Sequence, residues 1–388
     1  MDYHDSLYAP FGGFLLDKVP FSNVTLKKAY SSLVYCPKVE ERVPGAMYPR
    51  TIELQKKNKG KILATFERYT NETPYFPIYE SCDLGKTWTE ISKIEDKESG
   101  FGCRYQPHLY ELQSKCGELE AGTVLCAGNI IPDDFSTTSL RLYKSSDSGK
   151  NWEYVSEIAQ GGRAEVDLTN GERRPVWEPF LIDDGNGVLY CFYSDEQYDR
   201  EKGYNQALLH RKSVDGGMTW MDPVIDVGFK GNVLRPGMPV IAKLGSSEYI
   251  MVYEMVNQDR VPVYFRKSKT LDDWGDVDFM GNPIITANGE YLSGTPYITW
   301  IPYGGEHGTL LATGRGFSHI MANSLGGEGF WVKQEKMFDV DNQYGFSGYS
   351  QCVIPIDEGK KVLNLCPVHI SMTGAMIGAA VADVYEKV

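Results

Sequence analysis

SCDLGKTW at residues 81–88 is repeated with small changes as SSDSGKNW at 145–152 and as SVDGGMTW at 213–220. All three fit the pattern Ser-x-Asp-x-Gly-x-Thr/Asn-Trp. The Gly permits the positive φ of a tight turn, the Asp can accept hydrogen bonds from turn amides, and the Trp anchors packing between sheets. Two degenerate copies follow at 268–274 and 324–331. Three clear copies indicate a repeated structural unit rather than an isolated β-turn.

A second repeat consists of two apolar strands joined by a polar or glycine-containing turn, which predicts a hairpin. Six such hairpins lie at 47–68, 105–129, 176–196, 234–256, 294–316 and 348–369. We align them on Arg50, Pro107, Pro179, Pro236, Pro296 and Gln351. Most are followed by a third strand and an eight-residue box, so each unit predicts a four-stranded sheet.

Six such sheets fit best in a closed ring that protects their edges. A solenoid or a sandwich explains the common register of hairpins and boxes less well. We therefore expect an all-β fold, a six-bladed β-propeller of four-stranded antiparallel blades that forms a single domain over residues 1–388. Residues 1–45 should supply a closing strand to the last blade and a covering segment.

The composition of the chain argues against two classes of protein, nucleic-acid-binding proteins and proteins with a membrane-spanning helix. The 388 residues carry 39 Lys and Arg against 52 Asp and Glu, a net charge of −13, which argues against nucleic-acid binding through a basic face. No apolar run is long enough for a membrane-spanning helix. The N-terminus lacks a signal peptide, so the protein would be cytoplasmic if Met1 is the native start and secreted if a signal has been removed. The eight Cys show no zinc-like spacing and we expect mostly free thiols, no metal and no cofactor.

In a propeller of this kind the start of the first strand and the end of the second strand share the face opposite the boxes. The candidates on this rim are Tyr48, Arg50, Glu67, Arg68, Gln106, Asn129, Glu178, Asp195, Glu196, Arg235, Glu254, Thr295, Arg315, Tyr349 and His369. Carboxylates, arginines and tyrosines dominate the set. Charged groups are costly to desolvate where blades converge, so their concentration favours a functional site.

Two glutamates stand out on this rim. Glu178 lies in VWEPFL and Glu254 in MVYEMV, each a charge within an apolar strand. They could be structural carboxylates paired with Arg235 or Arg315. They could instead face a sugar, one as the acid that protonates the leaving oxygen and the other as the nucleophile. The apolar neighbours of Glu178, among them Trp177, would raise its pKa as an acid requires, and Arg235 could keep Glu254 ionised.

The boxes are similar to the Asp-box (BNR) repeats of the sialidase-superfamily propellers. The segments WEPFLIDDGNGVLYCFYSDE (177–196), VYEMV (252–256) and YPRTIEL (48–54) resemble the family 93 glycoside hydrolases, which are exo-acting α-L-arabinanases. That resemblance implies release of arabinobiose from the non-reducing end of 1,5-linked arabinan, with retention. It also implies Glu178 as acid/base and Glu254 as nucleophile. For such a retaining pair we expect carboxyl groups about 5–5.5 Å apart, or modestly more in an unliganded structure.

On this interpretation the partner is an oligosaccharide or polysaccharide, with no nucleic acid and no membrane, and the oligomeric state is left open. The expected substrate-binding residues are Arg50, Arg68, Gln106, Asn129, Trp177, Asp195, Arg235, Arg315, Tyr349 and His369. His108 could contact substrate or be structural.

Two other functions remain open at this stage. A sialidase needs three arginines and a Tyr–Glu nucleophile, which Arg50, Arg235, Arg315 and Tyr349 could partly supply. Two features differ from the sialidases, however. Their Phe/Tyr-Arg-Ile-Pro motif is replaced by the sequence YPRTI at 48–52, which shifts the arginine, and the Asp that would serve as acid/base is missing between Arg68 and the first box. The other alternative is a non-catalytic glycan-binding propeller.

Overall fold

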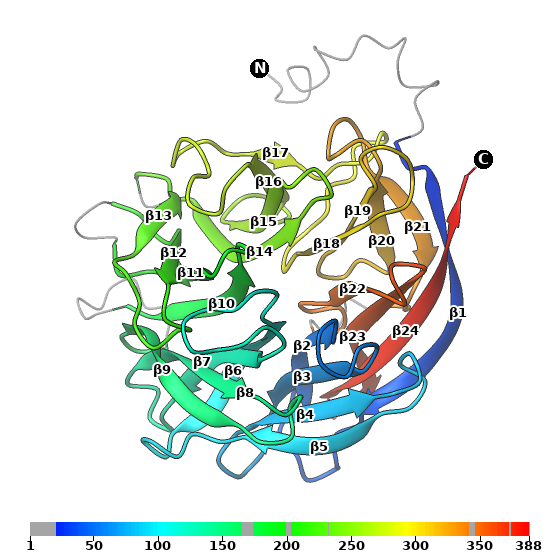
Figure 1. Cartoon of the computed structure of the whole chain (residues 1–388). Coiled ribbons are helices and arrows are strands. Elements are labelled where there is room, and N and C mark those ends of the chain that lie inside the picture. The colour runs from blue at the N-terminus through cyan, green and yellow to red at the C-terminus, as the bar shows by residue number, and fades with distance from the viewer. Residues whose placement is uncertain are drawn as a thin grey trace.

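The computed structural model describes residues 21–164, 174–198, 203–231, 233–340, 346–371 and 374–387. Six sheets of four antiparallel strands are arranged around a central axis (Figure 1), and no helix occurs among these residues. The predicted six-bladed β-propeller is therefore confirmed. Within the same ranges, no helical segment is long and apolar enough to span a membrane.

The blades follow chain order, each running from an inner strand at the axis to an outer strand. Blades one to three contain β2 (Ala46–Glu53), β3 (Ile62–Arg68), β4 (Phe76–Ser81) and β5 (Thr89–Ile94); β6 (Gly102–Glu111), β7 (Val124–Ile131), β8 (Thr138–Ser145) and β9 (Glu153–Gly161); and β10 (Val176–Asp183), β11 (Leu189–Asp195), β12 (Ala207–Ser213) and β13 (Val224–Val227). Blades four and five contain β14 (Arg235–Lys243), β15 (Tyr249–Val256), β16 (Val263–Ser268) and β17 (Asn282–Pro283); and β18 (Tyr297–Ile301), β19 (Thr309–Thr313), β20 (His319–Asn323) and β21 (Val332–Lys336). Blade six contains β22 (Cys352–Ile356), β23 (Lys361–Ser371), β24 (Gly374–Glu386) and, from the start of the chain, β1 (Val24–Tyr35).

Both ends of the described chain meet in the sixth blade. Strand β1 (blue in Figure 1) pairs antiparallel with β24 (red), with Val24 opposite Glu386 and Tyr35 opposite Ile377. The ring is thus closed by backbone hydrogen bonds between segments far apart in sequence. Closure of this kind protects the edges of the blades from pairing with other chains.

The three clear boxes form equivalent turns between the third and fourth strands of blades one to three. In the second box, Asp147 accepts hydrogen bonds from Ser145 Oγ at 2.8 Å and from Asn151 N at 2.9 Å. Trp152 Nε1 donates to Ser92 Oγ, on the outer strand of the preceding blade, at 3.2 Å. The other boxes repeat both sets of contacts, around Asp83 and Trp88 and around Asp215 and Trp220. Each box therefore fixes its own turn and also attaches its blade to the blade before it.

Strand register separates the boxes from the predicted catalytic residues. In blade three, Ser213 at the start of the box pairs with Leu189, which pairs with Asp183 at the far end of β10. Glu178 lies near the opposite end of that strand. The box in blade three thus lies at the other face of the ring from Glu178.

All eight cysteines are free, in agreement with the expectation of mostly free thiols.

A bulge interrupts the inner strand of the first four blades near its start. The ladder loses register between Met47 and Arg50, Tyr105 and His108, Trp177 and Phe180, and Gly237 and Val240. The first unpaired residue of each bulge has a positive φ, and corresponding residues precede β18 and β22. These six residues, called here the left-handed ring, are Tyr48, Gln106, Glu178, Met238, Thr295 and Ser350.

Five of the six ring residues are followed by proline, and Ser350 is followed by Gln351. Proline has no N–H, so it leaves no donor unsatisfied where the ladder is broken. The equivalent positions are therefore Pro49 and Pro239 rather than Arg50 and Pro236, on which we aligned blades one and four. That alignment was wrong by one residue in blade one and by three residues in blade four, where Pro236 is still paired in the ladder and Pro239 lies in the bulge.

Candidate active site

The left-handed ring turns backbone amides out of the sheets and toward the preceding blade. Gln106 N donates to Glu67 Oε1 at 2.8 Å, and Glu178 N donates to Gln106 Oε1 at 3.0 Å. Met238 N then donates to Glu178 Oε2 at 2.7 Å. The chain of hydrogen bonds runs around the axis through blades one to four. Strained backbone of this kind is typical of functional sites.

Glu178 is held at both its backbone and its carboxyl group. Oε2 accepts the Met238 amide and also the Ser194 hydroxyl, at 2.7 Å. Burial and, to a smaller extent, the charge of Glu254 together raise the pKa of Glu178 to about 7, against smaller lowering effects of Ser194, Arg235 and Met238. A carboxyl group with such a pKa holds a proton in mildly acidic solution, as a general acid must.

Glu254 lies in the neighbouring blade, on β15. Its Oε2 accepts the amide of Thr295, the ring residue of blade five, at 2.6 Å. Burial raises its pKa, whereas the Thr295 hydrogen bond and the charges of Arg235 and Arg315 lower it. We expected Arg235 to hold this carboxylate ionised, and the arginine does act in that direction, but burial outweighs it.

The backbone comes close to Glu254. Gly237 is opposite it in the β14–β15 ladder, and a Cβ there would lie 3.4 Å from Glu254 Oε1. Gly294, with φ +51°, is on the other side, where a Cβ would lie 3.5 Å from Oε2. A Cβ at either position would be in ordinary van der Waals contact with the carboxyl group, so the backbone at Gly237 and Gly294 forms its immediate surroundings.

Glu67 is a third carboxyl group at the site and was absent from the set of expected catalytic and binding residues. It is almost completely buried and accepts the Tyr69 hydroxyl at 2.9 Å in addition to the Gln106 amide. Burial, with a small contribution from the charge of Glu178, raises its pKa to about 7, although the Gln106 amide, the Tyr69 hydroxyl and Arg50 lower it. Ionisation of Glu178 therefore disfavours ionisation of Glu67.

Aromatic and apolar side chains form a separate cluster beside these carboxyl groups. The cluster contains Met47, Tyr48, Met238 and Ala375, with Tyr69, Phe346 and Tyr349 packed against it. Burial raises the pKa of Tyr349, and so do the charges of Glu254, Glu178 and Glu67. Tyr349 thus lies close to all three glutamates, where an aromatic face can pack on a sugar ring.

Three of the four expected arginines, Arg50, Arg235 and Arg315, have different environments. Arg50 is buried, stacks on the Tyr48 ring at 3.8 Å and donates to Ser350 O at 3.1 Å and Ser350 Oγ at 2.9 Å. Arg235 pairs with Glu196 at 2.6 Å. The Arg315 guanidinium is 5.7 Å from the centre of the Tyr349 ring. Arg235 and Arg315 flank Glu254, whereas Arg50 ties β2 to blade six.

The remaining expected residues are Trp177, Arg68, Asn129, Asp195 and His369. Trp177 directly precedes Glu178 on β10, and its Nε1 donates to Glu196 Oε1, the atom that also binds Arg235. Arg68 follows Glu67 on the strand and binds Glu41. Asn129 is buried and donates to Val176 O at 2.8 Å, which joins blades two and three.

Asp195 and His369 complete the set. Asp195 is buried and accepts the Gln197 amide at 2.7 Å, while the residue before it, Ser194, binds Glu178. His369 is near the end of β23, where its amide donates to Ser347 Oγ at 2.9 Å. Neither contact reaches Glu178 or Glu254.

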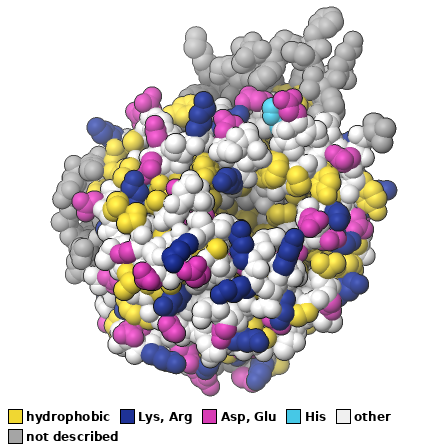
Figure 2. Space-filling view, viewed as in Figure 1, with side chains coloured by type: hydrophobic (Ala, Val, Ile, Leu, Met, Phe, Trp, Pro, Cys, Tyr) yellow, Lys and Arg dark blue, Asp and Glu magenta, His cyan; other side chains and the backbone are white. Residues whose placement is uncertain are grey.

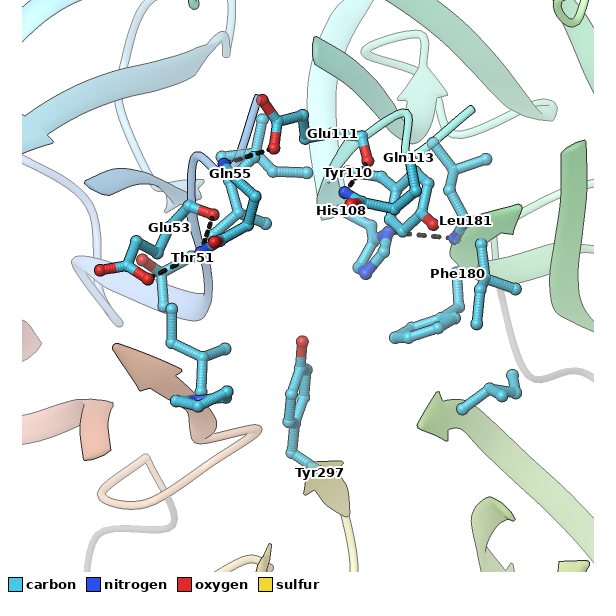
Figure 3. Close-up of a pocket in the computed structure, with 16 residues that line it drawn as sticks. Thr51, Glu53, Gln55, His108, Tyr110, Glu111, Gln113, Phe180, Leu181 and Tyr297 are labelled. Atoms are coloured by element: carbon cyan, nitrogen blue, oxygen red, sulfur yellow. Dashed lines mark hydrogen bonds between the residues drawn. The ribbon is translucent and has the colours of Figure 1, made fainter. Parts of the chain in front are cut away.

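A cavity of about 260 Å³ lies further along the axis (Figure 3). Its polar lining includes Thr51 and Glu53 from β2 and His108 from β6, and Tyr297 points into it from β18. Glu53 is the last residue of β2, at the opposite end of the strand from the bulge. The cavity therefore extends away from Glu178 and Glu254. Figure 2 shows a hollow at the middle of the ring with apolar side chains at depth and Lys and Arg around its edge.

Solved structures identify the family. The chain is 34% identical to the α-L-arabinanase of Penicillium chrysogenum, solved with arabinobiose, with a TM-score of 0.81 and coverage of 92% of this chain and 98% of that one. The same values hold for the GH93 α-L-arabinofuranosidase of Fusarium graminearum, also solved with arabinobiose. The chain belongs to glycoside hydrolase family 93. The predictions of a glycosidase and of this family are therefore confirmed.

Other comparisons concern only the fold of this family 93 enzyme. A Hadza microbial sialidase is 15% identical, with a TM-score of 0.54 and coverage of 89% of this chain and 66% of that one, which shows a shared propeller. No protein-family model and no curated protein matches the chain.

Among the described residues, no group of three or more His, Cys, Asp or Glu side chains is arranged to hold a metal ion.

Several site residues of this family 93 enzyme were missed from sequence. Met238 acts through its backbone and Ser194 through one hydroxyl, so neither side-chain type signalled a role. Tyr69 and Phe346 follow or precede the inner hairpins and were outside the rim set. The signal that could have found the ring is the proline that follows Gln106, Glu178 and Met238 at equivalent positions.

Proposed function

We propose that this glycoside hydrolase cleaves α-1,5-linked L-arabinan or arabino-oligosaccharides from the non-reducing end, with retention of anomeric configuration. The observation that carries the proposal is the pair of glutamates in adjacent blades, each fixed by the left-handed amide of the next blade. Similarity to two enzymes that were solved with arabinobiose supports the choice of sugar.

In the first step Glu178 gives its proton to the glycosidic oxygen while Glu254 attacks the anomeric carbon. Both hydrogen bonds to the Glu178 carboxyl fall on Oε2, so we assign the acidic proton to Oε1. By the same argument, Oε2 of Glu254 accepts the Thr295 amide and Oε1 makes the bond to carbon. The leaving sugar departs with the proton from Glu178.

In the second step a water molecule attacks the glycosyl–Glu254 ester. Glu178, now ionised, takes a proton from that water, and the ester bond to Glu254 breaks. Tyr349 and the neighbouring apolar side chains supply a surface for the sugar, and Arg235 and Arg315 lie beside the carboxylate that departs. A glutamate-to-alanine mutant of the Fusarium enzyme was solved with an iminosugar inhibitor, which agrees with a catalytic glutamate in this family.

The test is a product analysis with linear 1,5-arabinan, arabinotriose and sialyl-lactose. We expect arabinobiose from arabinan from the first time points, and no sialic acid. A mixture of long oligosaccharides at early times would contradict exo action, and release of sialic acid would contradict the choice of sugar. Arg50 is engaged by Ser350, so the three-arginine cluster of a sialidase has no support at this site.

A further inference from the structure

Alternate side chains of β6 accept backbone amides from β10 along the interface between blades two and three. Gln106 Oε1 accepts Glu178 N, His108 Nδ1 accepts Leu181 N, and the Tyr110 hydroxyl accepts Asp183 N, each at 3.0 Å. Figure 3 shows the bond from His108 to Leu181. The three bonds have the same form, but only the first reaches a residue of the proposed catalytic pair.

Gln106 is itself fixed from blade one. Its amide donates to Glu67 Oε1, and Glu67 Oε2 accepts the Tyr69 hydroxyl. With φ at 55°, Gln106 has a backbone conformation that is unfavourable for a residue with a Cβ, so the surrounding contacts must hold it there. Its side-chain oxygen is therefore presented to Glu178 from a backbone that Glu67 of blade one holds in place.

We propose that Gln106 is a positioning residue for the catalytic acid rather than a ligand of the sugar. The side-chain oxygen of Gln106 accepts the backbone amide of Glu178 and so keeps Glu178 in the left-handed conformation, φ 62°. In that conformation the carboxyl group of Glu178 is directed toward Ser194 and Met238. The inference rests on the proposed role of Glu178.

The physical reason is that the left-handed backbone of Glu178 is strained. Without an acceptor for its amide, the residue gains by returning to extended backbone, which moves the side chain. A displacement of about 1 Å of a catalytic group can cost on the order of 100-fold in rate. The loss should appear in the step that needs the acid and hardly at all in substrate binding.

The experiment compares Gln106→Met, which removes the acceptor, with Tyr110→Phe, which removes the matching acceptor at the far end of the same interface. For Gln106→Met we expect kcat on arabinotriose to fall about 10- to 100-fold, with KM within about twofold of wild type. An aryl arabinoside with a good leaving group needs little acid assistance and should be affected much less. Tyr110→Phe should leave kcat, KM and the pH profile unchanged.

Gln106→Glu is the second variant. Its carboxylate can accept the same amide and should restore most of kcat, while its charge should raise the pKa of Glu178 and shift the alkaline limb of the pH profile upward. Other groups that act on Glu178 or share its surroundings are Glu67, Glu254, Arg235, Tyr48 and Tyr349.

The outcomes separate this inference from the proposed function. A rise in KM alone in Gln106→Met, or equal losses on both leaving groups, would overturn the positioning role. If Gln106→Met does not fold, an unshifted pH profile in Gln106→Glu would overturn it instead. Full activity in Glu178→Ala would refute the proposed function itself.

Discussion

The backbone amide of Met238 donates a 2.7 Å hydrogen bond to Oε2 of Glu178, across the boundary between blades three and four. The amide is available because Met238 has φ 57° and lies in a bulge, outside the β14–β15 ladder. Thr295 makes the same contact with Glu254 one blade further on, at 2.6 Å. Backbone amides therefore orient both glutamates, and the Ser194 hydroxyl adds a second hydrogen bond to Glu178.

Glu254→Ala should abolish turnover on arabinotriose and on activated aryl arabinosides alike. No nucleophile remains for the first step, so leaving-group quality cannot compensate. The measurement is kcat for both substrates, with circular dichroism and Tm to show that the propeller is intact. Substantial turnover by a folded variant would contradict the role of Glu254.

Glu178→Ala should be selective. We expect kcat/KM on arabinotriose to fall by about 100- to 10,000-fold, the usual contribution of general acid–base catalysis, with a smaller loss in the first step for a good leaving group. Added azide should raise turnover of the aryl substrate, since a small anion can attack the ester without a general base. Equal losses on both substrates and no azide effect would argue for a purely structural glutamate.

Activity should depend on pH as a bell-shaped curve. Glu178 must be protonated, and burial together with the charge of Glu254 places its pKa at about 7. Glu254 must be ionised, and its pKa is raised by burial above the usual value. We expect kcat/KM to fall above about pH 7, with the midpoints belonging to the coupled pair. An optimum well above pH 8 would contradict the assignment.

Thermal stability should decline between about pH 5 and pH 8. Glu67 and Glu178 have pKa values of about 7 in the folded protein, whereas an unfolded chain ionises near pH 4.3. In this window the native state binds more protons than the unfolded state, so the stability that these groups contribute is lost as pH rises. Tm of Glu67→Gln should vary less with pH than that of wild type. Glu120→Gln, on the surface, should follow wild type.

Asp147→Ala tests the separation of the boxes from the site. Asp147 accepts hydrogen bonds from Ser145 and from both the amide and side chain of Asn151, so its loss should cost about 1–3 kcal/mol of unfolding free energy. The box lies at the other face of the ring, and kcat should stay within about twofold of wild type. Urea unfolding and steady-state kinetics provide the measurements. A large loss of kcat in a stable variant would contradict this separation.

The sequence allowed the blades to be predicted because their signals are local. A box such as Ser145–Trp152 contains its own turn chemistry, and each hairpin is a pair of apolar runs joined by a polar or glycine-containing turn. The inner-strand bulge leaves a weaker trace, because its left-handed residue varies from Tyr48 to Met238. Only the following proline is common to most copies, and our alignment was displaced because it used Arg50 in blade one and Pro236 rather than Pro239 in blade four.

The site was predicted less completely because side-chain type does not reveal direction. Glu67 and Arg68 are neighbours on one strand, yet the glutamate binds the Gln106 amide and the arginine binds Glu41. Asn129 was expected to contact sugar and instead joins two blades through Val176. Contacts made by backbone amides, as from Met238, have no side-chain signature at all.

The most direct test of the account is to trap the glycosyl–enzyme. The Glu178→Ala variant should accumulate the intermediate when given an arabinosyl donor with an excellent leaving group, because the second step lacks its base. Intact-mass measurement followed by peptide mapping then locates the adduct. We predict one glycosyl group per chain, esterified to Glu254. An adduct on another residue, or an inverted product with no adduct at all, would contradict the retaining pair of Glu178 and Glu254.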